Sequence, residues 1–426
     1  MNILEKISDW SKTYDQADFL IESLGPYAES IKSKELPLIL FGAGSAGRRL
    51  LPLFSMHGAP PVFVCDNDPR KAGAEIFGVP IVSVETAYSR IPQAVVVLAI
   101  NQNHNAIREQ CIKAGFHSDH VRTIRQTPLE FYTHIFQWYW KRDDLEEHAA
   151  ELARAYTLLA DKASQRLYLQ RIALLSHGAD YKSYVEHIAE HSYIGRVPCP
   201  PDIMLPENYY YFNNNVVRLT GRETLVDCGA FDGDSLEQFL LVGQQFSNST
   251  YIAHCLEPDP QNFSNLAQTY DKSDHVHLYP TGAWSERASL NFVGSDSPSV
   301  DKPSSARVSS DQTGTHIEAN ALDALLGDEH VSFIKMDIEG AEKEALQGAA
   351  RIISHGKPTL AISAYHHRDD IFRIPLLIEQ LCPGYRFHLR LFSRNFSEMV
   401  LFAIPVPHQT PKESSMGNLP NQGPTE

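Results

Sequence analysis

The stretch VDCGAFDGDS, residues 226–235, decides the fold of the second half of the chain. It continues an apolar run typical of a buried strand, and its glycines are typical of a turn that leads from a strand into a helix. Such turns usually hold a pyrophosphate on backbone N–H groups. This turn instead carries three carboxylates, Asp227, Asp232 and Asp234, which would repel a phosphate. It therefore predicts a ligand that tolerates or prefers negative charge.

The end of the next predicted strand favours an adenosine-bearing ligand. Glu257 stands there, where a carboxylate can accept hydrogen bonds from both ribose hydroxyls. Gly229 and Gly233 let the backbone approach a ligand closely. S-adenosylmethionine fits these features, because it has a ribose, an ammonium and a sulfonium but no phosphate. The alternative is a helix cap made by Asp232 or Asp234, and Glu257 favours the cofactor over the cap alone.

A second glycine loop, FGAGSAGRR, lies at residues 41–49. Gly42, Gly44 and Gly47 follow an apolar strand and precede a helical pattern, and Asp66 ends the next strand. Because this loop has no acid, its N–H groups favour an anion. We expect the first half of the chain to bind NAD, another nucleotide or a nucleotide-sugar. That these glycines only allow tight packing is an alternative that the sequence leaves open.

Alternating short apolar runs and helical patterns predict an α/β protein with two Rossmann-like domains joined by a helical segment. We expect a nucleotide-binding domain over residues 1–125, a helical connector or lid over 126–204, a second α/β domain over 205–404 and a disordered tail over 405–426. The Ser-, Asp- and Pro-rich segment 294–315 is expected to be a mobile loop.

Composition excludes several classes of protein. The chain has 426 residues, a net charge of −15 and a pI of 5.7, so it lacks the basic surface that nucleic acid or an anionic membrane requires. Six cysteines without a CxxC pair favour neither zinc nor disulfides. The first residues have no signal-peptide pattern, and the apolar run at 94–100 is too short for a membrane span, so we expect a cytoplasmic protein. Whether the chain forms a homo-oligomer is left open.

Four blocks of the second half, in this order, resemble FkbM-type methyltransferases: ETLVDCGAFDGDS, HCLEPDPQNFSNL, LDALL with VSFIKMDIEGAEKEALQGA, and SAYHHRDD. The resemblance covers about residues 205–404. It implies a class I S-adenosylmethionine-dependent domain that mostly methylates hydroxyl oxygens. It also implies a seven-stranded sheet of order 3-2-1-4-5-7-6 with strand 7 antiparallel. The first half is similar to nucleotide-sugar units of some carbohydrate enzymes, which favours a carbohydrate-related or other small-molecule acceptor.

The resemblance also assigns a cofactor site. It implies that the segment GAW approaches the adenine from the third strand. Together with the glycine turn, the residues expected at the cofactor are Asp227, Gly229, Phe231, Asp232, Gly233, Ser235, Glu257, Pro258, Gly282, Ala283, Trp284 and Asp337.

Four residues at or after the carboxyl ends of the fourth and fifth predicted strands are candidates for the chemistry: Lys335, Asp337, Glu339 and His366. A hydroxyl is a poor nucleophile, so a base must take its proton or a cation must lower its pKa. In one hypothesis His366 or Asp337 is the base. In the other, Asp337 and Glu339, with His366, hold Mg²⁺. The direct base is favoured, because carboxylates and a histidine equally form hydrogen-bonded networks. Lys335 has the alternative of a salt bridge to Asp337.

Three further expectations concern the surroundings of this site. Glu342 and Glu344 are expected on a solvated helix face. Tyr209–Phe212 are expected to line the entrance for the acceptor. The rival hypotheses are a nucleotide-binding protein whose methyltransferase-like domain is not catalytic, and a nicotinamide-dependent sugar oxidoreductase that uses the first glycine loop.

Overall fold

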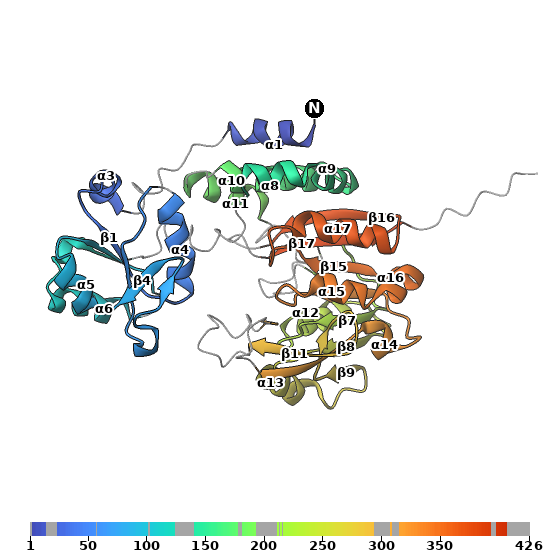
Figure 1. The fold of residues 1–426 in the computed structure, drawn as a ribbon. Coiled ribbons are helices and arrows are strands. Elements are labelled where there is room, and N and C mark those ends of the chain that lie inside the picture. Colours follow the sequence, from blue (N-terminus) through green and yellow to red (C-terminus); the bar gives the residue numbers. More distant parts are fainter. Residues whose placement is uncertain are drawn as a thin grey trace, which may run out of the picture.

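The computed structural model has two α/β units and a set of helices beside them, which confirms the predicted fold class (Figure 1). Among the residues that it describes, no helix is long and apolar enough to cross a membrane. The described residues are 2–13, 24–56, 58–100, 103–123, 140–177, 181–192, 211–212, 214, 216–293, 307–308, 315–392 and 398–406.

The first unit is a six-stranded sheet of order β3-β4-β2-β1-β5-β6. All neighbours are parallel except β3 and β4. Its strands are β1 (Leu38–Phe41), β2 (Phe63–Cys65), β3 (Glu75–Ile76), β4 (Val79–Val82), β5 (Val95–Leu98) and β6 (Val121–Thr123). Its helices are α3 (Ala28–Lys32), α4 (Ser45–Met56), α5 (Val84–Arg90) and α6 (His104–Ala114), with 3-10 turns at Gly25–Tyr27, Pro69–Lys71 and Ser118–His120.

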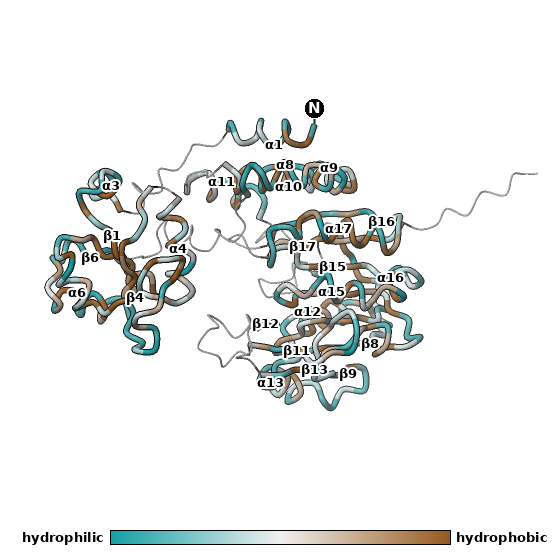
Figure 2. The backbone as a smooth tube through the Cα atoms, in the orientation of Figure 1, coloured by the Kyte–Doolittle hydropathy of each residue, from teal (hydrophilic) through white to brown (hydrophobic). Residues whose placement is uncertain are grey.

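Strand β1 shows why this sheet is buried on both faces. Ile39 and Phe41 point to one face and join a core with residues of α5 and α6. Leu38 and Leu40 point to the other face and join a core with Phe54 of α4. Successive side chains of a strand alternate between faces, so a continuous apolar run is what a sheet covered on both sides requires. Figure 2 shows the resulting apolar centre of the unit.

Helices from two distant parts of the sequence form the next layer. They are α1 (Ile3–Ser11), α8 (Arg142–Glu147), α9 (Ala149–Leu158), α10 (Lys162–His177) and α11 (Tyr181–His191). Helix α1 packs against α10 and α9, so the first helix contacts the segment predicted as a connector (Figure 1). Leu152 and Tyr168 of this layer are fully buried.

The second unit is a seven-stranded sheet of order β9-β8-β7-β14-β15-β17-β16. In chain order this is 3-2-1-4-5-7-6, and β17 is antiparallel to both neighbours, as predicted. Its strands are β7 (Thr224–Cys228), β8 (Ile252–Leu256), β9 (Val276–Tyr279), β14 (Phe333–Met336), β15 (Thr359–Ser363), β16 (Tyr385–Leu391) and β17 (Met399–Pro405). Its helices are α12 (Asp234–Gly243), α13 (Pro260–Tyr270), α14 (Leu322–Leu326), α15 (Glu342–Gln347), α16 (Ala350–Gly356) and α17 (Asp370–Leu381).

A separate four-stranded sheet, which the sequence did not predict, is inserted between β9 and β14. Its order is β10-β13-β11-β12. The strands are β10 (Gly282–Ala283), β11 (Ala288–Val293), β12 (Arg307–Val308) and β13 (Thr315–Asn320). The predicted third strand therefore ends at Tyr279, because Gly282 and Ala283 pair with β13 instead. Most of the predicted mobile loop 294–315 lies outside the described residues.

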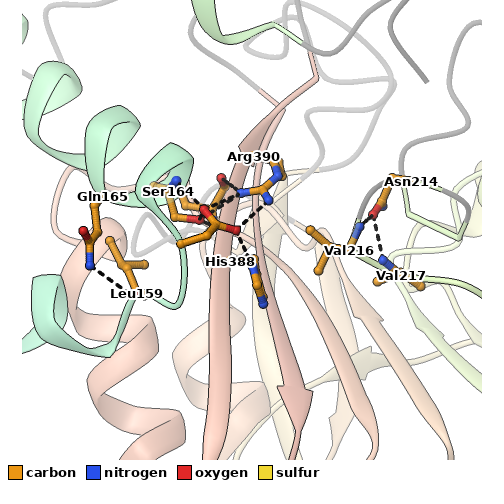
Figure 3. Close-up of polar contacts among 10 residues, drawn as sticks. Leu159, Ser164, Gln165, Asn214, Val216, Val217, His388 and Arg390 are labelled. Carbon is orange, nitrogen blue, oxygen red and sulfur yellow. Dashed lines mark hydrogen bonds and ion pairs between the residues drawn. The ribbon is translucent and has the colours of Figure 1, made fainter. Parts of the chain in front are cut away.

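The free edge of β16 is covered by the segment between α9 and α10 (Figure 3). Ala160 N donates to the carbonyl of Phe387 at 2.8 Å. The Asp161 carboxylate accepts a hydrogen bond of 2.8 Å from Arg390, which is 3% exposed, and lies 2.6 Å from His388. Figure 3 shows Ser164, His388 and Arg390 close together at the strand. The polar backbone of the edge strand is thereby partly paired and shielded.

Candidate active site

A pocket opens at the carboxyl ends of β7, β8 and β14, and the four-stranded sheet forms its far wall. Ligands of open parallel sheets bind at this edge, beside the point where the strand order reverses. The pocket brings together eight of the residues expected at the cofactor or the chemistry: Gly229, Phe231, Glu257, Pro258, Gly282, Ala283, Asp337 and Glu339.

The turn after β7 lies very close to the end of β14. Gly229 has a φ of +77°, and a Cβ there would lie 2.1 Å from the carbonyl oxygen of Asp337. The N–H groups of Gly229 and Ala230 both donate to the carbonyl of Leu256 at 3.0 Å. Only glycine combines this φ with the close approach. The turn is therefore fixed between the two strands that supply the acids of the pocket.

Glu257 is held at the end of β8 by two backbone N–H groups. Phe231 N donates to Oε2 at 2.9 Å, and Asp259 N donates to Oε1 at 2.8 Å. The residue is 5% exposed, and burial raises the pKa of its carboxyl group to about 7. The two hydrogen bonds thus fix the orientation of the Glu257 carboxyl group between the glycine turn and the pocket.

A buried ion pair lies beneath the turn. Lys335 Nζ is 2.9 Å from Asp227 Oδ1 and donates to the carbonyl of Gly229 at 2.7 Å. Burial alone would lower the pKa of Lys335, but the charges of Asp227 and Asp337 raise it above its usual range. The hydroxyl of Ser235 donates to the other oxygen of Asp227. Lys335 therefore pairs with Asp227 rather than with Asp337, and as a held cation it cannot act as a base.

Asp337 follows β14 and lines the pocket, and it is surrounded by donors. The hydroxyls of Tyr211 and Tyr365 donate to its two oxygens at 3.2 and 3.1 Å. His366 Nε2 lies 3.4 Å from Oδ1. Burial opposes ionisation, but the positive charges of His366 and Lys335 lower the pKa of Asp337 below its usual range. Asp337 is therefore a carboxylate at neutral pH.

Glu342 corrects one prediction. It was expected on a solvated helix face, but it is 1% exposed. Its Oε1 accepts a hydrogen bond of 2.9 Å from Ile338 N and lies 2.9 Å from His366 Nδ1. Helix α15 begins at this residue and turns it inward, a geometry that helical periodicity alone does not reveal. Glu344, two residues further along α15, is half-buried.

His366 lies among three carboxylates. Its side chain is 7% exposed, and Nε2 also lies 3.7 Å from Glu339 Oε2. Burial alone would lower its pKa, but Glu342, Asp337 and Glu339 raise the pKa to about 10. The imidazole is thus already protonated at pH 7, which removes it as a direct base. One ligand atom from each of Asp337, Glu342 and His366 lies within 4.8 Å of the others, so these residues could hold a metal ion.

Five residues expected at the cofactor lie outside the pocket lining: Asp227, Asp232, Gly233, Ser235 and Trp284. Asp227 and Ser235 support the turn from beneath. Asp232 is exposed, and Gly233, rather than either neighbouring aspartate, is the N-cap of α12. Trp284 is half-buried, and its backbone N–H donates to the carbonyl of Asn320 at 2.9 Å.

Several lining residues were not predicted. Asn262 comes from the start of α13, and the far wall is apolar: Leu290, Phe292, Ile317 and Ala319. The alternation in ASLNFV, where Leu290 and Phe292 share a face, is the signal that could have found this wall. Of the expected entrance Tyr209–Phe212, only Tyr211 and Phe212 lie within the described residues, and Tyr211 contacts Asp337.

In the first glycine loop, residues expected to bind a ligand also make contacts within the first unit. A Cβ on Gly47 would lie 1.8 Å from the carbonyl oxygen of Gly42, so this pair permits close packing of strand and helix. Gly44 is exposed with open space around it. Asp66 accepts a hydrogen bond of 2.7 Å from Ala43 N and forms an ion pair of 3.2 Å with Lys71. The acid at the end of the second strand thus contacts the glycine turn in both units.

Comparison with known proteins agrees with this architecture. Residues 227–396 match the family described as Methyltransferase FkbM domain, which confirms the resemblance found in the sequence. A crystal structure of a methyltransferase FkbM from Methylobacillus flagellatus KT is 19% identical, covers 94% of this chain and 99% of its own, and has a TM-score of 0.55. The Aeropyrum pernix fibrillarin, solved with natively bound S-adenosyl-L-methionine, is 7% identical over 44% of this chain and 70% of its own, with a TM-score of 0.28. No protein of curated function matches the chain. The fold of the Methylobacillus protein therefore extends over almost the whole chain.

Proposed function

We propose that this chain transfers the methyl group of S-adenosylmethionine to a hydroxyl oxygen of a carbohydrate-related or other small-molecule acceptor. The observation that carries the proposal is the pocket in which the turn at Gly229 and the buried Glu257 meet Asp337 and Glu339. The FkbM domain at residues 227–396 supports methyl transfer in general. The acids at the end of β14 support a hydroxyl acceptor, because they can receive its proton.

Within the proposal, Glu257 accepts hydrogen bonds from the ribose hydroxyls of the cofactor, since its carboxyl group is fixed at the strand end where such contacts form. The apolar wall that includes Phe292 and Ile317 suits an adenine ring. Asp337 and Glu339 line the same pocket, and their charges would stabilise the ammonium and sulfonium groups. S-adenosylmethionine supplies an electrophilic methyl group on sulfur.

Asp337 is the base in this proposal. When bound, S-adenosylmethionine would give its methyl group to the acceptor oxygen and leave as S-adenosylhomocysteine, and Asp337 would take the proton of the hydroxyl. A carboxylate with a low pKa suffices here, because a hydroxyl that gains a methyl group becomes strongly acidic. His366, which already carries a proton, holds Asp337 in its ionised form. Alignment of the acceptor with the carbon–sulfur bond supplies much of the acceleration.

The first unit has a second candidate function, the binding of a nucleotide or nucleotide-sugar. The specific observation is that Asp66 accepts the N–H of Ala43 in the glycine turn, as Glu257 accepts the N–H of Phe231. The open space around Gly44 leaves room for a phosphate beside the start of α4. A carbohydrate-related acceptor carried on a nucleotide would give both units a role in one reaction.

The test is calorimetric titration of the full chain with S-adenosylmethionine, S-adenosylhomocysteine, NAD and a UDP-sugar. Saturable binding of the first two ligands, lost in Glu257→Ala with the fold intact, is the expected result. Methyl transfer is then measured against a panel of sugars and nucleotide-sugars by mass spectrometry. Binding of NAD without S-adenosylhomocysteine would move the chemistry to the first unit and refute the proposal.

A further inference from the structure

We propose that Asp337, Glu342 and His366 form a binding site for one divalent metal cation beside the pocket. The binding itself does not depend on the proposed function. Only the role of the cation, the activation of an acceptor hydroxyl, rests on it. This site differs from the one expected from the sequence, because Glu342 was assigned to a solvated face and Glu339 to the metal.

The donor atoms lie near the separations that one cation requires. They come from a strand end, a helix start and the segment after β15, and all lie within 4.8 Å of one another. His366 Nδ1 is 2.9 Å from Glu342 Oε1, and Nε2 is 3.4 Å from Asp337 Oδ1, and one cation would take only one of these two nitrogens. Ligand atoms at ~2.1 Å from a divalent cation lie roughly 3 to 4 Å apart, so small side-chain shifts suffice.

The hydrogen bonding of the cluster is incomplete among the described residues, which points independently to a ligand. Glu342 is 1% exposed, and its Oε2 has no hydrogen-bond partner there. Both ring nitrogens of His366 likewise lack a hydrogen bond of acceptable geometry, although carboxylate oxygens lie nearby. A buried carboxylate oxygen left unsatisfied destabilises the fold. A bound cation would satisfy it, and one ring nitrogen of His366 would release its proton to bind the cation.

The neighbouring lysines Lys335 and Lys343 do not supply the positive charge that this cluster of carboxylates would bind. Lys335 Nζ lies 2.9 Å from Asp227, and Lys343 Nζ lies 3.3 Å from Asp370. Both ammonium groups are therefore engaged by other carboxylates. The net negative charge around His366 is the condition that attracts a divalent cation to a partly buried site.

The donor set selects the class of metal. Two carboxylates and one imidazole suit Mn²⁺ and related first-row ions, whereas Mg²⁺ prefers oxygen donors alone. Because Asp337 also lines the pocket, a cation here would adjoin the acceptor hydroxyl. A metal-bound hydroxyl loses its proton more readily.

The experiment is titration of the full chain with Mn²⁺, in which the electron paramagnetic resonance signal measures the concentration of the free ion. We expect one Mn²⁺ to bind per chain, and Glu342→Gln to weaken this binding at least ~10-fold. Glu344→Gln is the matched control, since it makes the same change on α15 outside the cluster, and it should bind like the wild type. Asp337→Asn is a second variant that tests the same site if Glu342→Gln does not fold.

Two results would overturn the proposal. One is a wild-type chain that binds no Mn²⁺ saturably, and the other is equal Mn²⁺ affinity in the wild type and in the folded variants of the cluster. Titration of the same samples with S-adenosylhomocysteine separates this outcome from failure of the proposed function. A wild-type chain that binds S-adenosylhomocysteine but not Mn²⁺ would refute only the metal site. A wild-type chain that does not bind S-adenosylhomocysteine would refute the proposed function.

Discussion

Replacing Glu257 with glutamine should stabilise the protein without cofactor and weaken cofactor binding. Burial raises the pKa of this carboxyl group from the 4.5 of an unperturbed glutamate to about 7. Between these values the folded protein holds a proton that the unfolded chain has released. The free energy of unfolding therefore falls as the pH rises from about 4.5 to about 7, and the loss is complete above that range.

The magnitude follows from the same values. One pKa unit corresponds to about 1.4 kcal/mol, so ionised Glu257 destabilises the folded protein by about 3 kcal/mol at about pH 8. Glutamine removes this charge but keeps one acceptor oxygen, so either Phe231 N or Asp259 N loses its partner at a cost of about 1 kcal/mol. The variant should be more stable by about 2 kcal/mol at about pH 8 and roughly equal to the wild type at about pH 5.

The assay is urea unfolding at both pH values without cofactor, using the transition that S-adenosylhomocysteine shifts in the wild type. Calorimetry at about pH 8 should show at least ~10-fold weaker S-adenosylhomocysteine binding, because a charged acceptor of the ribose hydroxyls is lost. Glu237→Gln, an exposed position on α12, is the control and should change neither quantity. A stability difference between Glu257→Gln and wild type that is the same at both pH values would refute the reasoning.

Three other substitutions test the site. Gly229→Ala should lower the free energy of unfolding by more than ~2 kcal/mol and abolish cofactor binding. The control is Gly384→Ala, which has a φ of +99° and no atom near its Cβ, and it should cost only about 1 kcal/mol in thermal unfolding. Similar losses in the two variants would contradict the close approach of Gly229 to Asp337. Lys335→Met should lower the free energy of unfolding by about 3 to 5 kcal/mol because Asp227 stays buried and unpaired, and the added change Asp227→Asn should restore most of it in urea unfolding; no restoration would exclude the pair as the cause. Asp337→Asn should lower kcat at least ~100-fold with a folded chain, and a kcat near that of the wild type would remove Asp337 as the base.

Much of the fold followed from the sequence because its strands are short apolar runs with turn residues at their ends. The order of the seven-stranded sheet and the antiparallel β17 came from the resemblance, since strand patterns alone do not fix which strands pair. The inserted sheet was missed, because β10 has only two residues and the polar segment after β11 reads as a loop.

The candidate site was predictable where chemistry follows a strand end. Glu257 and Asp337 reach the pocket because parallel strands bring their carboxyl ends to one edge of the sheet. The partners of charged side chains were not predictable, because they depend on long-range packing. Lys335 pairs with Asp227 across β14 and β7, and Glu342 turns inward at the start of α15. A pattern read along one helix or strand contains neither contact.

The cover on β16 determines which fragments of this chain can be handled alone. A fragment that starts at residue 205 would contain the whole seven-stranded sheet but would lack Asp161, so Arg390 would keep its charge at a site built to bury it. The unpaired edge of β16 would also become a template for other chains, a common route to aggregation. A fragment that starts near residue 140 keeps the covering helices and is the better choice for crystallisation or for a library of variants.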